Sequence, residues 1–308
     1  MVMVTLSEQV FALRGSQPCH TTTTPVPTGP AVPAVPAAPT GAARCAARSP
    51  EPSASWPTPG TSRPCGLLRS FAARGIHTTV ALFDPDEYAE YCGEHGLDPD
   101  TSETRTRFTA ELAGSGTVLP YTGQPIDELV PLLVDEAVRH ATWEYATAVL
   151  AGVGRCADCG EDIGHASFDR AADALKRLVA GAGPGHHHFV CSVPTEDEQL
   201  VAVLHADTTG DPDTPPRIEG RESLDFVTVL AAGLALGGPG GLVVRSTTEG
   251  HRDRVHGWRL DRGRLTALSA AAVFNAYCTD ADTGDLVAPE PGVEYCPGYE
   301  VDAPGPHH

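Results

Sequence analysis

The sequence predicts an α+β protein: a helical N-terminal unit, followed by a small, mostly antiparallel sheet with helices and a zinc-knuckle-like insertion. Apolar residues recur at three- and four-residue steps over residues 125–150, as on one face of an amphipathic helix. Short runs rich in valine and bounded by turn residues predict strands near residues 187–194, 200–206, 241–247 and 254–260. Between these regions lies Cys156-Ala157-Asp158-Cys159-Gly160, a spacing typical of a metal-binding turn.

The first segment, residues 1–80, is predicted to be disordered, because residues 17–65 consist largely of proline, alanine, threonine and serine. Such a composition buries too little apolar surface to offset the entropy lost on ordering. Met1 and Met3 are the only methionines, and regular periodicity begins near Val80. We therefore expect the natural start to lie near Val80, with residues 1–80 outside the natural product.

Residues 81–152 form the predicted helical unit. Asp84 and Pro85 provide a cap and a proline for a first turn, and the helix should end at Gly96. A second helix is expected from about residue 100 to Gly114, and a third covers 125–150, where Pro131 either kinks the helix or marks its first turn.

Residues 153–308 form the predicted α+β unit, with the candidate zinc site and a loop-rich C-terminus. Amphipathic spacing predicts helices over residues 167–179, 222–236 and 269–277. The short link from Pro194 to Glu198 joins two predicted strands as a hairpin. From Asp280 onward the chain is rich in proline, glycine and acidic residues, which indicates loops.

The candidate zinc ligands are Cys156, Cys159, His188 and Cys191. Gly160 allows the tight turn in which two thiolates reach one ion. The second pair, His188 and Cys191, is harder to place, because three residues of a straight strand span about 10 Å. Both side chains can reach one zinc ion only if the backbone bends between them. The choice of the other two ligands among His186, His187, His188 and Cys191 stays open, and His165 is a further candidate.

Composition and charge set the expected cellular setting. The chain has 21 basic and 40 acidic residues and a formal charge of −19, and residues 1–80 hold six arginines against two glutamates, so residues 81–308 carry −23. An acidic surface disfavours nucleic acid as a partner, since phosphate binding depends on lysine and arginine. No apolar run approaches the length of a membrane span. Nine cysteines without a recognisable signal peptide predict a cytoplasmic protein, where paired cysteines usually bind metal.

These observations favour a zinc-stabilised cytoplasmic protein that binds or regulates another protein and has no catalytic activity. An alternative is a metal-dependent hydrolase with an open site near His187, His205 and Asp207. It assumes a hairpin centred on Asp197, which pairs residue 187 with 207 and places Cys191 on the same face. A third alternative is a nucleic-acid-binding zinc module, which the negative charge disfavours.

Overall fold

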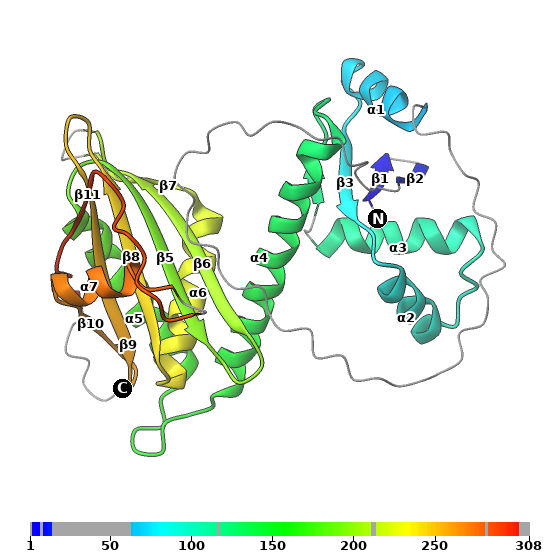
Figure 1. Cartoon of the computed structure of the whole chain (residues 1–308). Coiled ribbons are helices and arrows are strands. Elements are labelled where there is room, and N and C mark those ends of the chain that lie inside the picture. The colour runs from blue at the N-terminus through cyan, green and yellow to red at the C-terminus, as the bar shows by residue number, and fades with distance from the viewer. Residues whose placement is uncertain are drawn as a thin grey trace. The chain divides into compact units, whose positions relative to one another are not determined.

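The structure, a computed structural model, describes residues 2–6, 9–13, 63–115, 118–210, 214–280 and 283–301. These residues form two units, one up to His140 and one from Ala141 onward, and the division falls within helix α4 (Ile126–Gly152) (Figure 1). Most of the Pro/Ala/Thr-rich segment, residues 17–65, lies outside the described residues. The prediction that this segment is disordered therefore concerns residues that the structure does not describe. The mixture of helices and largely antiparallel strands confirms the α+β class.

The first unit contains a sheet in the order β2-β1-β3-β4 in addition to helices, so the structure does not support the prediction of a helical N-terminal unit. Its antiparallel strands are β1 (Val2–Leu6), β2 (Gln9–Leu13), β3 (Thr78–Leu82) and β4 (Val118–Pro120). The predicted boundary at residue 80 cuts through β3. Strands this short have little local pattern, and β3 pairs with β1, which is more than 70 residues earlier in the chain.

Three helices of the first unit agree with their sequence signals: α2 (Pro85–His95), α3 (Ser102–Ser115) and the first half of α4. A further helix, α1 (Arg63–Ala73), lies within residues 1–80, where the sequence predicted disorder. Asp84 caps α2 by accepting a hydrogen bond from the Asp86 amide, and Gly96 ends it with φ 62°. Pro131 lies inside α4, one turn after its start.

The second unit is built on a sheet in the order β10-β9-β8-β5-β6-β7, with β11 added to β9. All pairings are antiparallel except that of β11 with β9. The strands are β5 (His186–Pro194), β6 (Gln199–Asp207), β7 (Arg217–Ile218), β8 (Gly240–Thr247), β9 (Asp253–Asp261), β10 (Arg264–Ala267) and β11 (Val293–Tyr295). The predicted strands are therefore confirmed to within about one residue at each end.

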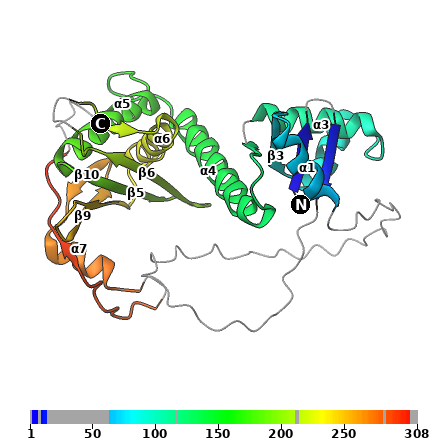
Figure 2. The same cartoon turned by 90° about the horizontal axis from the view of Figure 1, so that it is seen from above.

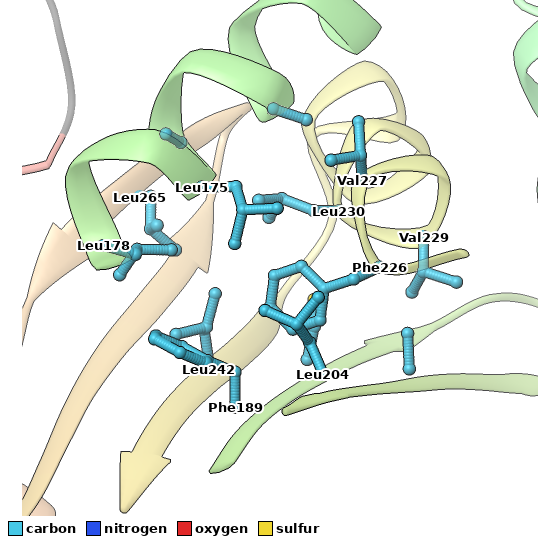
Figure 3. Packing of buried hydrophobic residues seen from close by; sticks show 14 of the residues in the cluster. Leu175, Leu178, Phe189, Leu204, Phe226, Val227, Val229, Leu230, Leu242 and Leu265 are labelled. Carbon is cyan, nitrogen blue, oxygen red and sulfur yellow. The ribbon is translucent and has the colours of Figure 1, made fainter. Parts of the chain in front are cut away.

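Helices α5 (Ile163–Ala182) and α6 (Gly220–Leu236) pack on one face of this sheet (Figure 2). Figure 3 shows Phe189, Leu204 and Leu242 of the strands pointing toward Phe226 and Leu230 of α6. Burial of these apolar side chains is the main source of stability for the unit. The three helices predicted in this unit are confirmed, and α5 is longer than its amphipathic stripe suggested.

Helix α7 (Ala270–Tyr277) lies on the opposite face, over the β9 end of the sheet (Figure 2). There Val273 packs over Gly257 of β9, where an added Cβ would lie only 3.1 Å from the valine methyl. Within the described ranges, no helix covers the same face of β5, β6 and β8, and the side chains there are half-buried or exposed. We call this surface the open face.

The described part of the chain contains no helix with the length and apolar character needed to cross a lipid bilayer.

Candidate functional site

A cluster of histidines lies on the open face, where β5, β6 and β8 run side by side. In the antiparallel register, His186 is opposite Asp207, and His188 is opposite both His205 and Arg245. Because side chains alternate along a strand, these residues all project to the same side of the sheet. Together they line a shallow hollow of about 280 Å³ that also contacts Arg217 of β7 and Thr247.

The predicted hairpin register is wrong by one residue. The turn is closed by a hydrogen bond of 2.8 Å from the Thr195 amide to the Glu198 carbonyl, so its centre lies between Glu196 and Asp197. A turn centred between two residues pairs even positions with odd ones, whereas a turn centred on Asp197 pairs odd with odd. As a result, His187 and Cys191 lie on the core face, away from His205 and Asp207.

The rings of His188 and His205 stack across the strand pair, with centroids 4.8 Å apart and planes inclined by 14°. Glu222 of α6 accepts a hydrogen bond of 2.8 Å from the His205 amide and lies 3.2 Å from its Nδ1. Burial lowers the pKa of His188, and the neighbouring His205 lowers it further. The stacked pair therefore favours at least one neutral ring.

Asp207 of β6 also lines the hollow. Its carboxylate accepts hydrogen bonds from the side chain and the amide of Thr209 and pairs with Arg217. Nδ1 of His186 lies 3.8 Å from the same carboxylate. The hydrogen bonds from Thr209 and Arg217 lower the pKa of Asp207, so it is a carboxylate at neutral pH.

Arg245 of β8, which also lines the hollow, is held by two acidic residues. Its guanidinium donates two hydrogen bonds, of 3.0 and 2.8 Å, to the carboxylate of Glu290. Its Nε donates a third, of 2.8 Å, to Asp253. The hydrogen bonds to Glu290 are the main reason why the pKa of Arg245 is raised. The charge of Arg245 is thus compensated, and its position is fixed.

His187 has a structural role in the core. Its Nδ1 is 2.9 Å from the Ser246 hydroxyl, and its Nε2 lies 2.8 Å from the Thr208 hydroxyl and 3.0 Å from the Gly183 carbonyl. The side chain is 2% exposed, and burial lowers its pKa. Because His187 and His205 project from opposite faces, the structure does not form the hydrolase site predicted from His187, His205 and Asp207.

The predicted zinc ligands occupy three separate places. Cys156 and Cys159 lie together in the loop between α4 and α5, whereas His188 is on the open face and Cys191 is fully buried in the core. His188 and Cys191 cannot share an ion, because an odd spacing on a straight strand places them on opposite faces. Burial raises the pKa of the Cys191 thiol to about 12, as expected for a core residue. Among the residues that the structure describes, no group of three or more His, Cys, Asp or Glu side chains is arranged to hold a metal ion.

The remaining cysteine pair has a defined local geometry. The Cys156 amide donates to the Glu161 carbonyl at 2.8 Å, and the Gly160 amide donates to the Cys156 carbonyl at 2.9 Å. Gly160 adopts φ 76°, which glycine allows without strain. Amides of Cys159 and Asp158 donate to the Cys156 sulfur and lower the pKa of its thiol. Of the four predicted zinc ligands, the structure therefore places only Cys156 and Cys159 in the same loop.

Several residues of the hollow were missed by sequence reasoning. Arg217 of β7 and Arg245 of β8 line it, and Glu222 of α6 contacts His205 beside it; all three positions depend on contacts between distant segments. The available signal was the two-residue spacing of His186 and His188, which places both on one face of an extended segment.

Comparison with known proteins finds a family model that matches part of the chain. Residues 64–124, within the first unit, match a family model described as a domain of unknown function (DUF8829). No curated protein and no solved structure matches the chain. The matched residues run from α1 to just beyond β4 and contain none of the residues that line the hollow on the open face.

Proposed function

We propose that this chain is a protein-binding protein that docks its partner on the open face of the second unit. The observation that supports the proposal is the surface formed by β5, β6 and β8 beside the histidine-lined hollow. Val190, Val201 and Val243 are half-buried there, and Val203 is 38% exposed. A partly apolar surface beside fixed hydrogen-bonding groups is typical of the centre of a protein interface.

The chemistry of the hollow suits docking. Its arginines are already paired, Arg217 with Asp207 and Arg245 with Glu290. They therefore offer a partner hydrogen-bond donors but little uncompensated charge. The imidazoles of His186 and His205 are about two-thirds exposed and offer a donor or an acceptor to a partner side chain. The hollow is shallow and of the size of one or two side chains, which fits an anchor residue of a protein partner.

The charge of the chain supports a partner with a basic rim. The formal charge of −19 gives long-range attraction to a positively charged protein and repulsion from nucleic acid. In the same proposal, a zinc ion at the exposed Cys156–Cys159 turn stabilises the loop between α4 and α5, as its amide-to-sulfur hydrogen bonds support.

The docking proposal is tested by placing a photo-cross-linking amino acid at Val203 in the host cell and identifying the protein that it captures. The purified partner is then titrated by calorimetry against the full chain. Val203→Arg is expected to weaken binding at least about tenfold, since truncation or charge at an interface centre costs about 1–3 kcal/mol.

Val138→Arg is the matched control, because Val138 is an exposed valine of α4, 61% exposed, and belongs to the first unit. It is expected to bind the partner like the wild type. Equal affinities of the wild type and Val203→Arg would overturn the proposal, and so would an equal loss in both variants. His205→Ala supplies a second variant within the hollow and should also weaken binding.

A further inference from the structure

The loop between α4 and α5 carries two cysteines on the surface of the second unit (Figure 1). An isolated bridge between Arg155 and Asp162 closes the base of this loop. Every residue from 154 to 162 is exposed except Cys156, which is half-buried. Small molecules in solution can therefore reach the sulfur atoms of Cys156 and Cys159.

The turn within the loop holds the two thiols against each other. The Gly160 amide donates to the Cys156 carbonyl at 2.9 Å and closes the turn. Residues three apart in a tight turn have Cα atoms within about 7 Å, and a disulfide requires about 4.4–6.8 Å. The Cys159 side chain forms a hydrogen bond with the Cys156 sulfur, so the two sulfur atoms are already neighbours.

The backbone around Cys156 stabilises its thiolate. Amides of Cys159 and Asp158 donate to the Cys156 sulfur and, together with the Cys159 side chain, lower the pKa of Cys156. The thiolate is the nucleophile in thiol–disulfide exchange, so Cys156 is prepared to react first. Cys159 is placed to react second, because its side chain already contacts the Cys156 sulfur.

We infer that Cys156 and Cys159 form a reversible disulfide by exchange with a small-molecule disulfide, such as oxidised glutathione. This inference goes beyond the proposed function and depends neither on docking at the open face nor on zinc. Zinc and the disulfide use the same two sulfur atoms, so each excludes the other. An exposed disulfide is readily reduced again, which makes the pair a redox-sensitive site of modification.

The exchange takes place in two steps. The Cys156 thiolate attacks one sulfur of the small-molecule disulfide, so a mixed disulfide forms and the first small thiol leaves as a thiolate. The Cys159 thiolate then attacks the Cys156 sulfur, which forms the bond between the two cysteines and releases the second small thiol. The cysteines lose two electrons, the small-molecule disulfide gains them, and the protons of the cysteines end on the released thiols.

The test uses the full chain, reduced, treated with EDTA and equilibrated with defined ratios of reduced and oxidised glutathione. The exchange is stopped with acid, free thiols are blocked with N-ethylmaleimide in denaturant, and the chain is digested with trypsin. Cleavage after Arg155 and Arg170 places both cysteines, and no other, in one peptide, residues 156–170. In mass spectrometry the disulfide form of this peptide is unlabelled and lighter than the reduced form by two hydrogen atoms.

Oxidised glutathione is expected to convert this peptide to its internal disulfide, and dithiothreitol should restore both thiols. At a fixed level of reduced glutathione, the folded chain should be half-oxidised by roughly tenfold less oxidised glutathione than the chain in urea, because the ordered turn lowers the entropy cost of closing the ring. Equal requirements in the folded and the unfolded chain would overturn the inference.

Cys159→Ser should stop at the mixed disulfide, with one glutathione on Cys156, since the second thiol is missing. Cys156→Ser is likewise expected to lose the internal disulfide. Cys296→Ser is the matched control, because Cys296 is also half-buried, and it should be oxidised like the wild type. Changing the cysteines at positions 19, 45 and 65 together to serine should also leave the internal disulfide intact.

A peptide that carries two glutathiones, or one that is cross-linked to the peptide of another cysteine, would overturn the inference. Addition of Zn²⁺ separates it from the zinc part of the proposed function. Bound zinc that prevents oxidation would support both. A disulfide that forms in a chain that binds no zinc would overturn the zinc part alone, and a zinc-binding chain that resists oxidation after EDTA treatment would overturn this inference alone.

Discussion

Gly233 of α6 is the point where this helix comes closest to the sheet, and Gly233→Ala tests the packing of the second unit. A Cβ at this position would lie 2.4 Å from Leu260 of β9 and 2.7 Å from Val193 of β5. Leu260 is fully buried and Val193 is 2% exposed, so neither side chain can move without displacing its own neighbours. The added methyl group is therefore expected to push α6 away from the sheet.

Two opposing effects decide the sign of the change. Alanine is favoured over glycine in a helix interior by about 1 kcal/mol. Overpacking a buried site costs about 1–3 kcal/mol, and two contacts below 3.0 Å with buried side chains place Gly233 in the upper part of that range. We therefore expect a net loss of about 1–2 kcal/mol in the free energy of unfolding, or roughly 2–8 °C in Tm for a unit of this size.

The measurement is urea unfolding followed by tryptophan fluorescence, because Trp258 is 1% exposed in the core of the second unit and its emission changes on unfolding. Gly93→Ala in α2 is the control, since its added Cβ meets nothing within 4 Å. It should stabilise the first unit by about 0.5–1 kcal/mol, as seen by circular dichroism. A Gly233→Ala variant as stable as the wild type would refute the close packing of α6 against β5 and β9.

Three further predictions follow from the described side chains. His187 is neutral in the fold because burial lowers its pKa, so the second unit should lose stability as pH falls below the unfolded value of about 6.5, and His187→Gln should reduce this dependence in unfolding curves at pH 7 and 5. Glu290→Ala removes the paired hydrogen bonds to Arg245, whose side chain is 32% exposed, and should cost about 1 kcal/mol in urea unfolding, less in high salt. Cys159 should react with iodoacetamide within minutes in the native protein, whereas Cys191, buried and with its pKa raised to about 12, should react only after unfolding, as mass spectrometry of the peptides can show.

Local signals were sufficient for most helices and for the central strands. Asp84 and Gly96 mark both ends of α2, because a side-chain cap and a positive-φ residue act within a few residues of the helix. The sheet of the first unit could not be predicted in this way. Its strands have three to five residues, and β3 finds its partners in β1 and β4, so their pairing depends on contacts across long stretches of chain.

The candidate site shows the same division between local and distant information. Alternation alone places His186 and His188 on one face and His187 and Cys191 on the other, whatever the partner strand. Which residues of β6 lie beside them depends on a single turn, and closure between Thr195 and Glu198 pairs His188 with His205.

The last contribution to the site comes from a strand that is distant in sequence. Arg245 reaches the histidines because β8 pairs with the free side of β5, and Glu290 and Asp253 then hold its guanidinium in place. No pattern within β5 or β6 contains this information. The histidines could be found from the sequence, whereas the paired arginine that makes their surroundings a hydrogen-bonding surface follows only from the assembled sheet.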